Sequence, residues 1–521
     1  MNVSQAQDGG EKGGSGPGGG GQARTVRLVG LFLGPALWAV IMLLPNMGGL
    51  EGAARAAVAL TAWMAAWWIT EAVPLEATAL LPIVVYPLTG VMPAGQVTLQ
   101  YGNSTIFLFL SGFLLSVAIE KWGLHQRIAL QIIMLVGFSP SRIVLGFMAA
   151  TAFLSLWISN SATAMMMVPI GLAVIRKLEA IIREQHLPID IRPEHFPLGT
   201  ALMLGIGYAA SIGGLGTLIG SPPNAIFAAY VQTAYGETIS FLDWMLYGLP
   251  IAVIGTLVAW VYLAFIGYRM PNLNMPGVEG VIKRAYEQLG PMSATEKRVA
   301  AVFVLTAIAW VIRGFVEAPL AAIGVTGLTD TTVGIMGALA LFLVPAGTRT
   351  KEGFSDGQRL LEWRDTSDLP WGVLVLFGGG LALAAGIEGS GAAQWAAEQL
   401  AVLQGTPPLV VLLVVVTIVI ALTTVTSNTA TATILMPVMA GLAQGLGLHP
   451  YVLLITSTTA ASCAFMLPVS TPPTAIVFGS GYIKLTDMVR AGFWLSTAFV
   501  GITTVLAYWW VPLVWGISVT P

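Results

Sequence analysis

The stretch SNSATAMMMVPI at residues 159–170 recurs as SNTATATILMPV at residues 427–438. Each copy opens with a Ser-Asn-Ser/Thr triplet, here called the first knot (159–161) and the second knot (427–429), and ends in an apolar run that contains a proline. A second pair follows in the same order, GSPPNAI at 220–226 and STPPTAI at 470–476. Two matched pairs in one order predict a chain built from two structural repeats.

The composition places these repeats in a membrane. Of the 521 residues, 56% are hydrophobic and 9% charged, with a mean hydropathy of +0.81, whereas a soluble domain carries about 25% charged residues. The net charge of -2 argues against a basic surface that binds nucleic acid. The single cysteine excludes an internal disulfide framework, and the four scattered histidines are too few for a His-rich metal centre. A transporter, a channel or an intramembrane enzyme remains.

Apolar stretches predict an all-α polytopic membrane protein with about eleven transmembrane helices. Each stretch is long enough to cross about 30 Å of hydrocarbon. The predicted spans are 26–46, 54–70, 75–92, 103–120, 197–218, 240–268, 298–314, 330–346, 370–387, 450–468 and 490–515. Two further regions, 140–176 and 407–444, each have two apolar arms around a knot, and each arm looks too short to cross by itself. These regions predict re-entrant helical hairpins, which are tolerated where the broken backbone is buried or lines a wet cavity.

The basic residues predict the orientation in the cell inner (plasma) membrane. With the N-terminus in the cytoplasm, 18 of the 23 Lys and Arg residues fall in cytoplasmic segments, three more (Lys121, Arg127 and Arg142) lie around an amphipathic stretch at the inner interface, and only Arg55 and Arg313 lie outside. This asymmetry predicts a cytoplasmic N-terminus and an external C-terminus. Residues 1–25 are Gly-rich without an apolar stretch, which predicts a disordered cytoplasmic tail.

The polar interval 269–297 predicts a cytoplasmic linker between two halves of comparable size. Each half holds several spans, one hairpin and one span interrupted by two prolines, at 222–223 or 472–473. An odd number of spans in a half turns the two copies to opposite faces of the membrane. That arrangement is an inverted repeat, in which the binding site lies at the interface of the repeats.

The knots predict a site for an anion beside sites for a cation. Ser and Asn are preferred N-caps, so the second arm of each hairpin should begin at Asn160–Ser161 and at Asn428–Thr429. The free N–H groups and positive dipole end of each arm attract an anion. The carbonyl oxygens that end the first arm suit a hard cation such as Na⁺, and the double prolines expose further carbonyls. A single Ser-Asn pair in a membrane helix usually serves packing, but two copies, each with a proline break, favour a transport site.

Residue types that are absent narrow the mechanism. No Asp, Glu, Lys, Arg or His lies in either knot or either proline break. Because intramembrane carboxylates mark proton relays, proton-driven exchange is the weaker hypothesis. The chain also has no HExxH, Cys/His pair or P-loop, so it is predicted not to be an enzyme and to use no organic cofactor. The glycines at 213, 214 and 216 predict close packing of backbones.

Taken together, these motifs resemble the divalent anion/sodium symporter family, which includes sodium-dependent dicarboxylate, citrate and sulfate transporters. The resemblance rests on the two knots, both proline breaks and three longer stretches. These are WWITEAVPLEATALLP at 67–82, WGVLVLFGGGLALAAGIEGSG at 371–391 and ASCAFMLPVSTPPTAIVFGSG at 461–481. It runs from about residue 27 to residue 515.

The resemblance implies an elevator-type transporter that works as a homodimer. A scaffold domain would comprise residues 26–138 and 298–405, and a transport domain residues 139–268 and 406–515. Na⁺ would be the coupling ion, bound by Ser155, Ser159, Asn160 and Gly220 in one half and by Thr423, Thr426, Asn428 and Ser470 in the other. The small dicarboxylate anion would meet Asn160, Ser161, Ser221, Asn428, Thr429, Thr471 and Pro472.

The chain departs from the family pattern at two positions. Ser161 stands where the family usually has Thr, and Thr474 stands where Asn usually follows the second double proline. From the knots and the resemblance together, the first hypothesis is import of C4-dicarboxylates (succinate, malate or fumarate) by sodium symport. The alternatives are a sodium-independent dicarboxylate exchanger, a sulfate or citrate transporter of the same family, and an anion channel.

Overall fold

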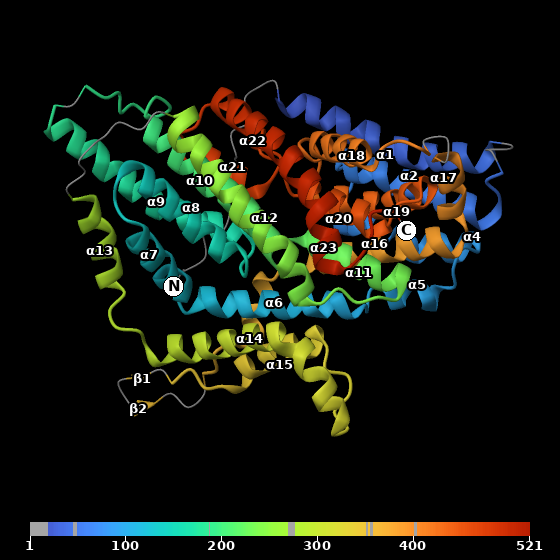
Figure 1. Cartoon of the computed structure of the whole chain (residues 1–521), viewed down its shortest axis with the longest axis horizontal. Helices are drawn as coiled ribbons and strands as arrows, with labels where there is room; N and C mark the ends of the chain where they lie inside the picture. The colour runs from blue at the N-terminus through green and yellow to red at the C-terminus, as the bar shows by residue number, and fades with distance from the viewer. Residues whose placement is uncertain are drawn as a thin grey trace, which may run out of the picture.

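The computed structural model describes residues 19–44, 49–186, 188–268, 277–347, 349–350, 353–354, 358–400 and 404–520 (Figure 1). Within these ranges the chain is helical, apart from loops and a two-residue antiparallel pairing of β1 (Arg349–Thr350) with β2 (Gly353–Phe354). Eight of the described helical segments are long and apolar enough to cross a membrane. The prediction of an all-helical membrane fold is confirmed.

In its described part, the first half has seven helices before the first hairpin. Its elements are α1 (Gly19–Leu43), α2 (Gly52–Thr70), α3 (Leu75–Thr78), α4 (Leu81–Thr89), α5 (Ala94–Gln100), α6 (Ser104–Lys121), α7 (Leu124–Val136), α8 (Pro140–Ser155), α9 (Asn160–Glu184), α10 (Pro197–Gly213), η1 (Gly214–Gly216), α11 (Pro222–Tyr235), α12 (Phe241–Val261) and the π-helix η2 (Tyr262–Gly267).

The second half repeats this order of long helices, hairpin and broken span. Its elements are α13 (Val278–Gln288), α14 (Ala294–Ala322), α15 (Asp330–Leu343), η3 (Trp363–Asp368), α16 (Trp371–Gly389), α17 (Ala392–Leu400), α18 (Pro408–Thr423), α19 (Asn428–Leu446), α20 (Pro450–Ala461), α21 (Pro472–Phe478), α22 (Leu485–Val505), the π-helix η5 (Leu506–Trp510) and α23 (Val511–Trp515).

Both hairpins form at the predicted places, but their arms differ from the expectation. The first arms, α8 and α18, have 16 residues each, while the second arms, α9 and α19, have 25 and 19. At 1.5 Å per residue, the second arms are long enough to reach across a hydrocarbon core. The prediction that every arm is too short to cross is therefore wrong for α19, which is among the segments long and apolar enough to cross a membrane; α9 has the length but is not among those segments.

The two halves exchange their short helices after the proline breaks. Helix α11, from the first half, packs on α19 and α20 of the second half, and α21, from the second half, packs on α9 and α10 of the first. In the same way α8 packs on α10 while α18 packs on α20. Matching helices of the two halves therefore make matching contacts, as two structural repeats should.

Several boundaries differ from those read in the sequence. Helix α1 begins at Gly19, inside the predicted tail, whose residues 1–18 lie outside the described part of the chain. The predicted span 75–92 is divided into α3 and α4, and the span 450–468 ends as a helix at Ala461. The linker 269–297 contains α13, which the sequence analysis did not predict.

Helices α14 and α15 lie along one long edge of the molecule, with α6 beside them (Figure 1). Helix α12 runs obliquely through the view, and its first turn reaches this edge (Figure 1). The hairpins and broken helices lie on the other side of α6 (Figure 1). The residues of both knots are half-buried.

Candidate functional site

Both knots and both proline breaks line one cavity of about 1310 Å³. The residues come from segments more than 250 positions apart in the chain. The site residues predicted from the sequence that line it are Ser159, Asn160, Ser161, Gly220, Ser221, Thr426, Asn428, Thr429, Ser470, Thr471 and Pro472. The structure therefore brings together all of the predicted site residues except Ser155 and Thr423, which lie directly behind the cavity wall.

The knots lie at helix ends because their residues interrupt two apolar helices. Helix α8 ends at Ser155 and α9 begins at Asn160, where the Ser159 hydroxyl accepts a hydrogen bond from the Ala162 N–H at 3.3 Å. Helix α18 likewise ends at Thr423, and α19 begins at Asn428. The predicted helix starts are confirmed, so the first N–H groups of two helices face one cavity.

A cluster of oxygen atoms surrounds the amide of Asn160. The buried Ser155 hydroxyl lies 2.6 Å from the Asn160 amide oxygen and 2.6 Å from the Ala210 carbonyl oxygen. In this orientation the amide oxygen faces only acceptors. Turned over, the amide nitrogen would donate to Ala210 O at 3.1 Å, Gly220 O at 3.2 Å and Ser155 Oγ at 2.6 Å. This end of the amide is thus surrounded by oxygen atoms, and we call the group the first oxygen cluster (Ser155, Asn160, Ala210, Gly220).

The second knot repeats this arrangement. The buried Thr423 hydroxyl lies 2.8 Å from the Asn428 amide oxygen and 2.7 Å from the Ala461 carbonyl oxygen. Thr423 and Asn428 stand where Ser155 and Asn160 stand in the first half, and Ala461 takes the place of Ala210. We call these three residues the second oxygen cluster. Its geometry supports the internal symmetry that the sequence predicted.

Side chains after the proline breaks hold the loops next to the clusters. Asn224, fully buried, donates from its amide nitrogen to Gly214 O at 2.8 Å and Thr217 O at 2.7 Å. Its counterpart Thr474 donates to Pro468 O at 3.2 Å and to Thr471 O at 2.7 Å. In the first loop, the Asn224 side chain thus binds two carbonyl oxygens outside the first turn of α11. In the second loop, the Thr474 side chain binds only one carbonyl oxygen outside the first turn of α21, that of Pro468.

Glycines allow the backbone to close around the first cluster. A Cβ atom at Gly213 would lie 2.4 Å from Ala152 O, and one at Gly220 would lie 2.6 Å from Gly214 O and 3.0 Å from Ser155 O. The predicted close packing at residues 213, 214 and 216 is confirmed. In the second loop, Ser470 is the counterpart of Gly220. The Ser470 hydroxyl donates to Thr424 O at 2.6 Å. The first cluster is accordingly the more tightly enclosed of the two.

Two residues beside the second knot show further detail. The Thr426 hydroxyl donates to Leu422 O at 2.8 Å and lies 2.7 Å from the Thr431 hydroxyl. The counterpart of Ser159 in the repeat is Ser427, which lines the cavity but was not predicted as a site residue. Register alignment of the knots would have identified it.

Charged side chains line the cavity away from the knots. Lys121 forms an ion pair with Asp365 at 2.5 Å, and Arg27 lies 3.7 Å from Glu71. Burial raises the pKa of Asp365, but hydrogen bonds from Lys121 and the Glu362 N–H, together with the charges of Lys121 and Arg364, hold the pKa below its ordinary value. These residues were not predicted to belong to the cavity. Neither were Phe109, Phe113, Ser116 and Glu120 of α6, although their spacing places them on one helix face.

Comparison with known proteins gives consistent results. Residues 25–516 match the family described as the sodium:sulfate symporter transmembrane region. The chain is 43% identical over 495 residues to the sodium-dependent dicarboxylate transporter SdcS of Staphylococcus saprophyticus, covering 95% of this chain and 93% of the relative. The SdcS protein of Staphylococcus aureus is 43% identical over the same shares of both chains.

Two solved structures share the fold. The MtrF efflux pump of Neisseria gonorrhoeae aligns with a TM-score of 0.55 at 12% identity, covering 93% of this chain and 97% of that chain. The YdaH transporter of Alcanivorax borkumensis aligns with a TM-score of 0.55 at 16% identity, covering 96% and 99%. At such low identity the likeness concerns the fold alone.

Proposed function

Because the chain belongs to the sodium:sulfate symporter family, and is thus a multi-pass membrane transporter and not an enzyme, we propose that it imports C4-dicarboxylates by sodium symport. Succinate, malate and fumarate are the proposed substrates. The named function of the SdcS relatives supports a dicarboxylate and Na⁺ as the transported pair. The observation that carries the proposal is the repeated oxygen cluster behind each knot.

Each oxygen cluster has the chemistry of a sodium site. In the first cluster, the Asn160 amide oxygen faces the carbonyl oxygens of Ala210 and Gly220 and the Ser155 hydroxyl. Hard cations bind carbonyl, amide and hydroxyl oxygens of this kind, and broken membrane helices supply them in sodium-coupled transporters. A Na⁺ ion held there would be coordinated by the amide oxygen of Asn160 together with these atoms. The second cluster would bind Na⁺ through Asn428 and backbone carbonyls, including that of Thr426.

The substrate would lie between the knots. The N-terminal ends of α9 and α19 present N–H groups and positive dipole ends to the same cavity. Two bound Na⁺ ions would add positive charge, so both carboxylates could bind without a basic side chain at the knots. Hydroxyl groups on both sides of the cavity would complete the contacts: those of Ser161, Ser221, Thr429 and Thr471.

The proposed transport cycle is an elevator movement in a homodimer. Residues 26–138 and 298–405 would form the scaffold part, and residues 139–268 and 406–515 the transport part. The cavity is lined by Arg27, Lys121 and Asp365, which the distribution of basic residues assigns to the cytoplasmic side. This arrangement would therefore be open to the cytoplasm, with the N-terminus inside the cell and the C-terminus outside.

A sodium-independent exchanger is the second candidate, and the loop at Thr474 favours it. The Thr474 hydroxyl ties the second loop less extensively than the Asn224 amide ties the first. A looser loop would bind its cation more weakly. Exchange would then depend on substrate on both sides of the membrane.

Uptake into proteoliposomes tests the proposal. Labelled succinate should accumulate against its gradient with an inward Na⁺ gradient and not when K⁺ replaces Na⁺, with or without internal succinate. Uptake that requires internal succinate and ignores Na⁺ would establish the exchanger instead. A channel could not concentrate succinate without an electrical driving force, so accumulation at zero membrane potential separates a transporter from a channel.

Replacing Thr474 by asparagine should strengthen the second cation site. The longer amide can donate to two loop carbonyls, as Asn224 does, and one added hydrogen bond of about 1 kcal/mol corresponds to roughly fivefold tighter sodium binding. The half-saturating Na⁺ concentration for succinate uptake is the measurement. An unchanged or higher value would show that this position does not support the site.

A further inference from the structure

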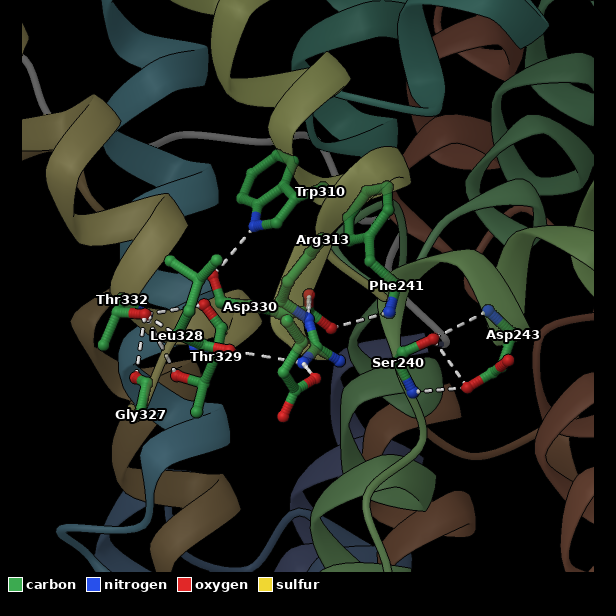
Figure 2. Close-up of polar contacts among 11 residues, drawn as sticks. Ser240, Phe241, Asp243, Trp310, Arg313, Gly327, Leu328, Thr329, Asp330 and Thr332 are labelled. Atoms are coloured by element: carbon green, nitrogen blue, oxygen red, sulfur yellow. Dashed lines mark hydrogen bonds and ion pairs between the residues drawn. The ribbon is translucent and has the colours of Figure 1, made fainter. Parts of the chain in front are cut away.

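Asp330, the first residue of α15, binds two partners with its two carboxylate oxygens (Figure 2). The Arg313 Nε donates to Asp330 Oδ1 at 2.7 Å, and the backbone N–H of Phe241 donates to Asp330 Oδ2 at 2.7 Å. The Asp330 side chain is 6% exposed. Arg313 belongs to the proposed scaffold part, but Phe241 belongs to the proposed transport part. The Asp330 carboxylate therefore forms a bridge that joins the proposed scaffold part to the proposed transport part.

The scaffold side of this bridge is held firmly. The Asp330 carbonyl oxygen accepts a hydrogen bond from the Trp310 indole N–H at 2.8 Å. Arg313 also donates to Glu317 at 2.9 Å and to Leu328 O at 3.3 Å (Figure 2). These bonds orient the carboxylate from both α14 and α15, so it cannot follow a moving partner far.

The transport side of the bridge contacts chain segments next to the first knot. Phe241 is the first residue of α12, and its ring stacks on that of Trp157 with centroids 6.1 Å apart. One turn later, the Trp244 indole N–H donates to Leu215 O at 2.9 Å, in the loop that follows α10. The first turn of α12 therefore contacts both chain segments that surround the first oxygen cluster.

The bond at Phe241 stabilises the N-terminal end of α12. The first N–H groups of a helix have no partner within the helix, and the positive end of the dipole favours a carboxylate. Ser240 and Asp243 form the local capping box, while Asp330 supplies the partner for Phe241 from another helix. The Phe241 ring also stacks on Trp310 at 4.6 Å between centroids. Separation of the two parts would break the Phe241–Asp330 hydrogen bond and the Phe241–Trp310 stacking together.

We propose that the bond from the Phe241 N–H to Asp330 is a latch that stabilises this arrangement and breaks when the transport part moves. The inference rests on the proposed division into scaffold and transport parts. A displacement of a few ångströms exceeds the length of a hydrogen bond, and each end of the latch is fixed to its own part. The latch thus favours the state in which the cavity has its present opening.

A proline at position 241 removes the N–H donor with little change to the backbone. Proline is favoured at the first position of a helix, and Ser240 has φ -73 and ψ 162, the extended conformation required before proline. The matched control is Phe241→Ala, which loses the ring but keeps the N–H. The difference between Phe241→Pro and Phe241→Ala therefore reports the hydrogen bond.

The state of the protein can be followed with a cysteine at position 165. Met165 lines the cavity and is 56% exposed, whereas the native Cys463 is fully buried and serves as the unlabelled background. Labelling Met165→Cys with an impermeant maleimide, in inside-out and in right-side-out vesicles, gives the ratio of the two orientations of the cavity. Loss of a hydrogen bond to a charged group should shift this ratio toward the outward side by roughly tenfold or more in Phe241→Pro relative to Phe241→Ala.

Equal ratios for Phe241→Pro and Phe241→Ala would overturn the latch. If Phe241→Pro does not give folded protein, Asp330→Asn keeps the shape and one oxygen but removes the charge, and a smaller shift in the same direction is expected. An unchanged ratio in this variant would also overturn it. The labelling requires no substrate, so its outcome is separate from wild-type succinate uptake, whose failure would instead overturn the proposed function.

Discussion

Replacing Asn160 or Asn428 by alanine is expected to reduce sodium-driven succinate uptake at least about a hundredfold, because each amide serves the cation pocket and the anion pocket together. Each asparagine begins a hairpin arm, and its amide oxygen lies within 2.8 Å of a buried hydroxyl of the preceding arm. Alanine would remove an oxygen ligand of the cation and one hydrogen-bond partner of that hydroxyl. Initial uptake rates in proteoliposomes, at matched protein levels, measure the loss.

Asn103→Ala is the matched control for both variants. The Asn103 side chain caps α6 by accepting a hydrogen bond from the Thr105 N–H at 2.8 Å, and it does not line the cavity. Its loss should cost about 1 kcal/mol of stability and leave uptake close to the wild-type rate. Wild-type uptake by Asn160→Ala or Asn428→Ala would refute the assignment of the knots as the transport site.

Gly220→Ala is expected to weaken sodium binding roughly tenfold or more and to destabilise the protein by about 1–3 kcal/mol. The added Cβ atom would lie 2.6 Å from Gly214 O and 3.0 Å from Ser155 O, and neither is the end of a flexible side chain. The backbone around the first oxygen cluster must therefore move. The stabilisation of the purified protein by added NaCl, with KCl as the reference, measures the affinity through the shift in melting temperature.

The matched control for this change is Gly314→Ala. Gly314 lies inside α14, where a Cβ atom would meet nothing within 4 Å, and alanine favours a helix interior over glycine by about 1 kcal/mol. This variant should keep the sodium-dependent shift of the wild type. Equal sodium responses for Gly220→Ala and Gly314→Ala would show that the first cluster does not bind the ion.

The sequence predicted the knots well because their signals are local. Ser159 and Asn160 stop one helix and start the next by capping, and Pro222 fits the first turn of α11. The second copy carries the same signals at Asn428 and Pro472. Helix starts at these four residues required no knowledge of the rest of the chain.

Other parts of the site could not be predicted in this way. The carbonyl oxygens of Ala210 and Ala461 contribute to the two clusters, yet every residue has a carbonyl, so no residue type identifies these two. Lys121 and Asp365 meet across 244 positions of the chain. The arms α9 and α19 also exceeded the expected length, because hydropathy did not reveal that their polar ends continue as helix.

The amino-acid sequence alone determined that this protein is a helical membrane protein with two repeats, and that each repeat has a knot and a proline break. These properties depend on composition, capping and periodicity, which act over a few residues. The tertiary structure alone decided that α11 and α21 exchange halves, that the two knots share one cavity, and that Asp330 binds the N-terminal end of α12. Those contacts join segments distant in the chain, and they follow from how complete helices pack together, which no local pattern encodes.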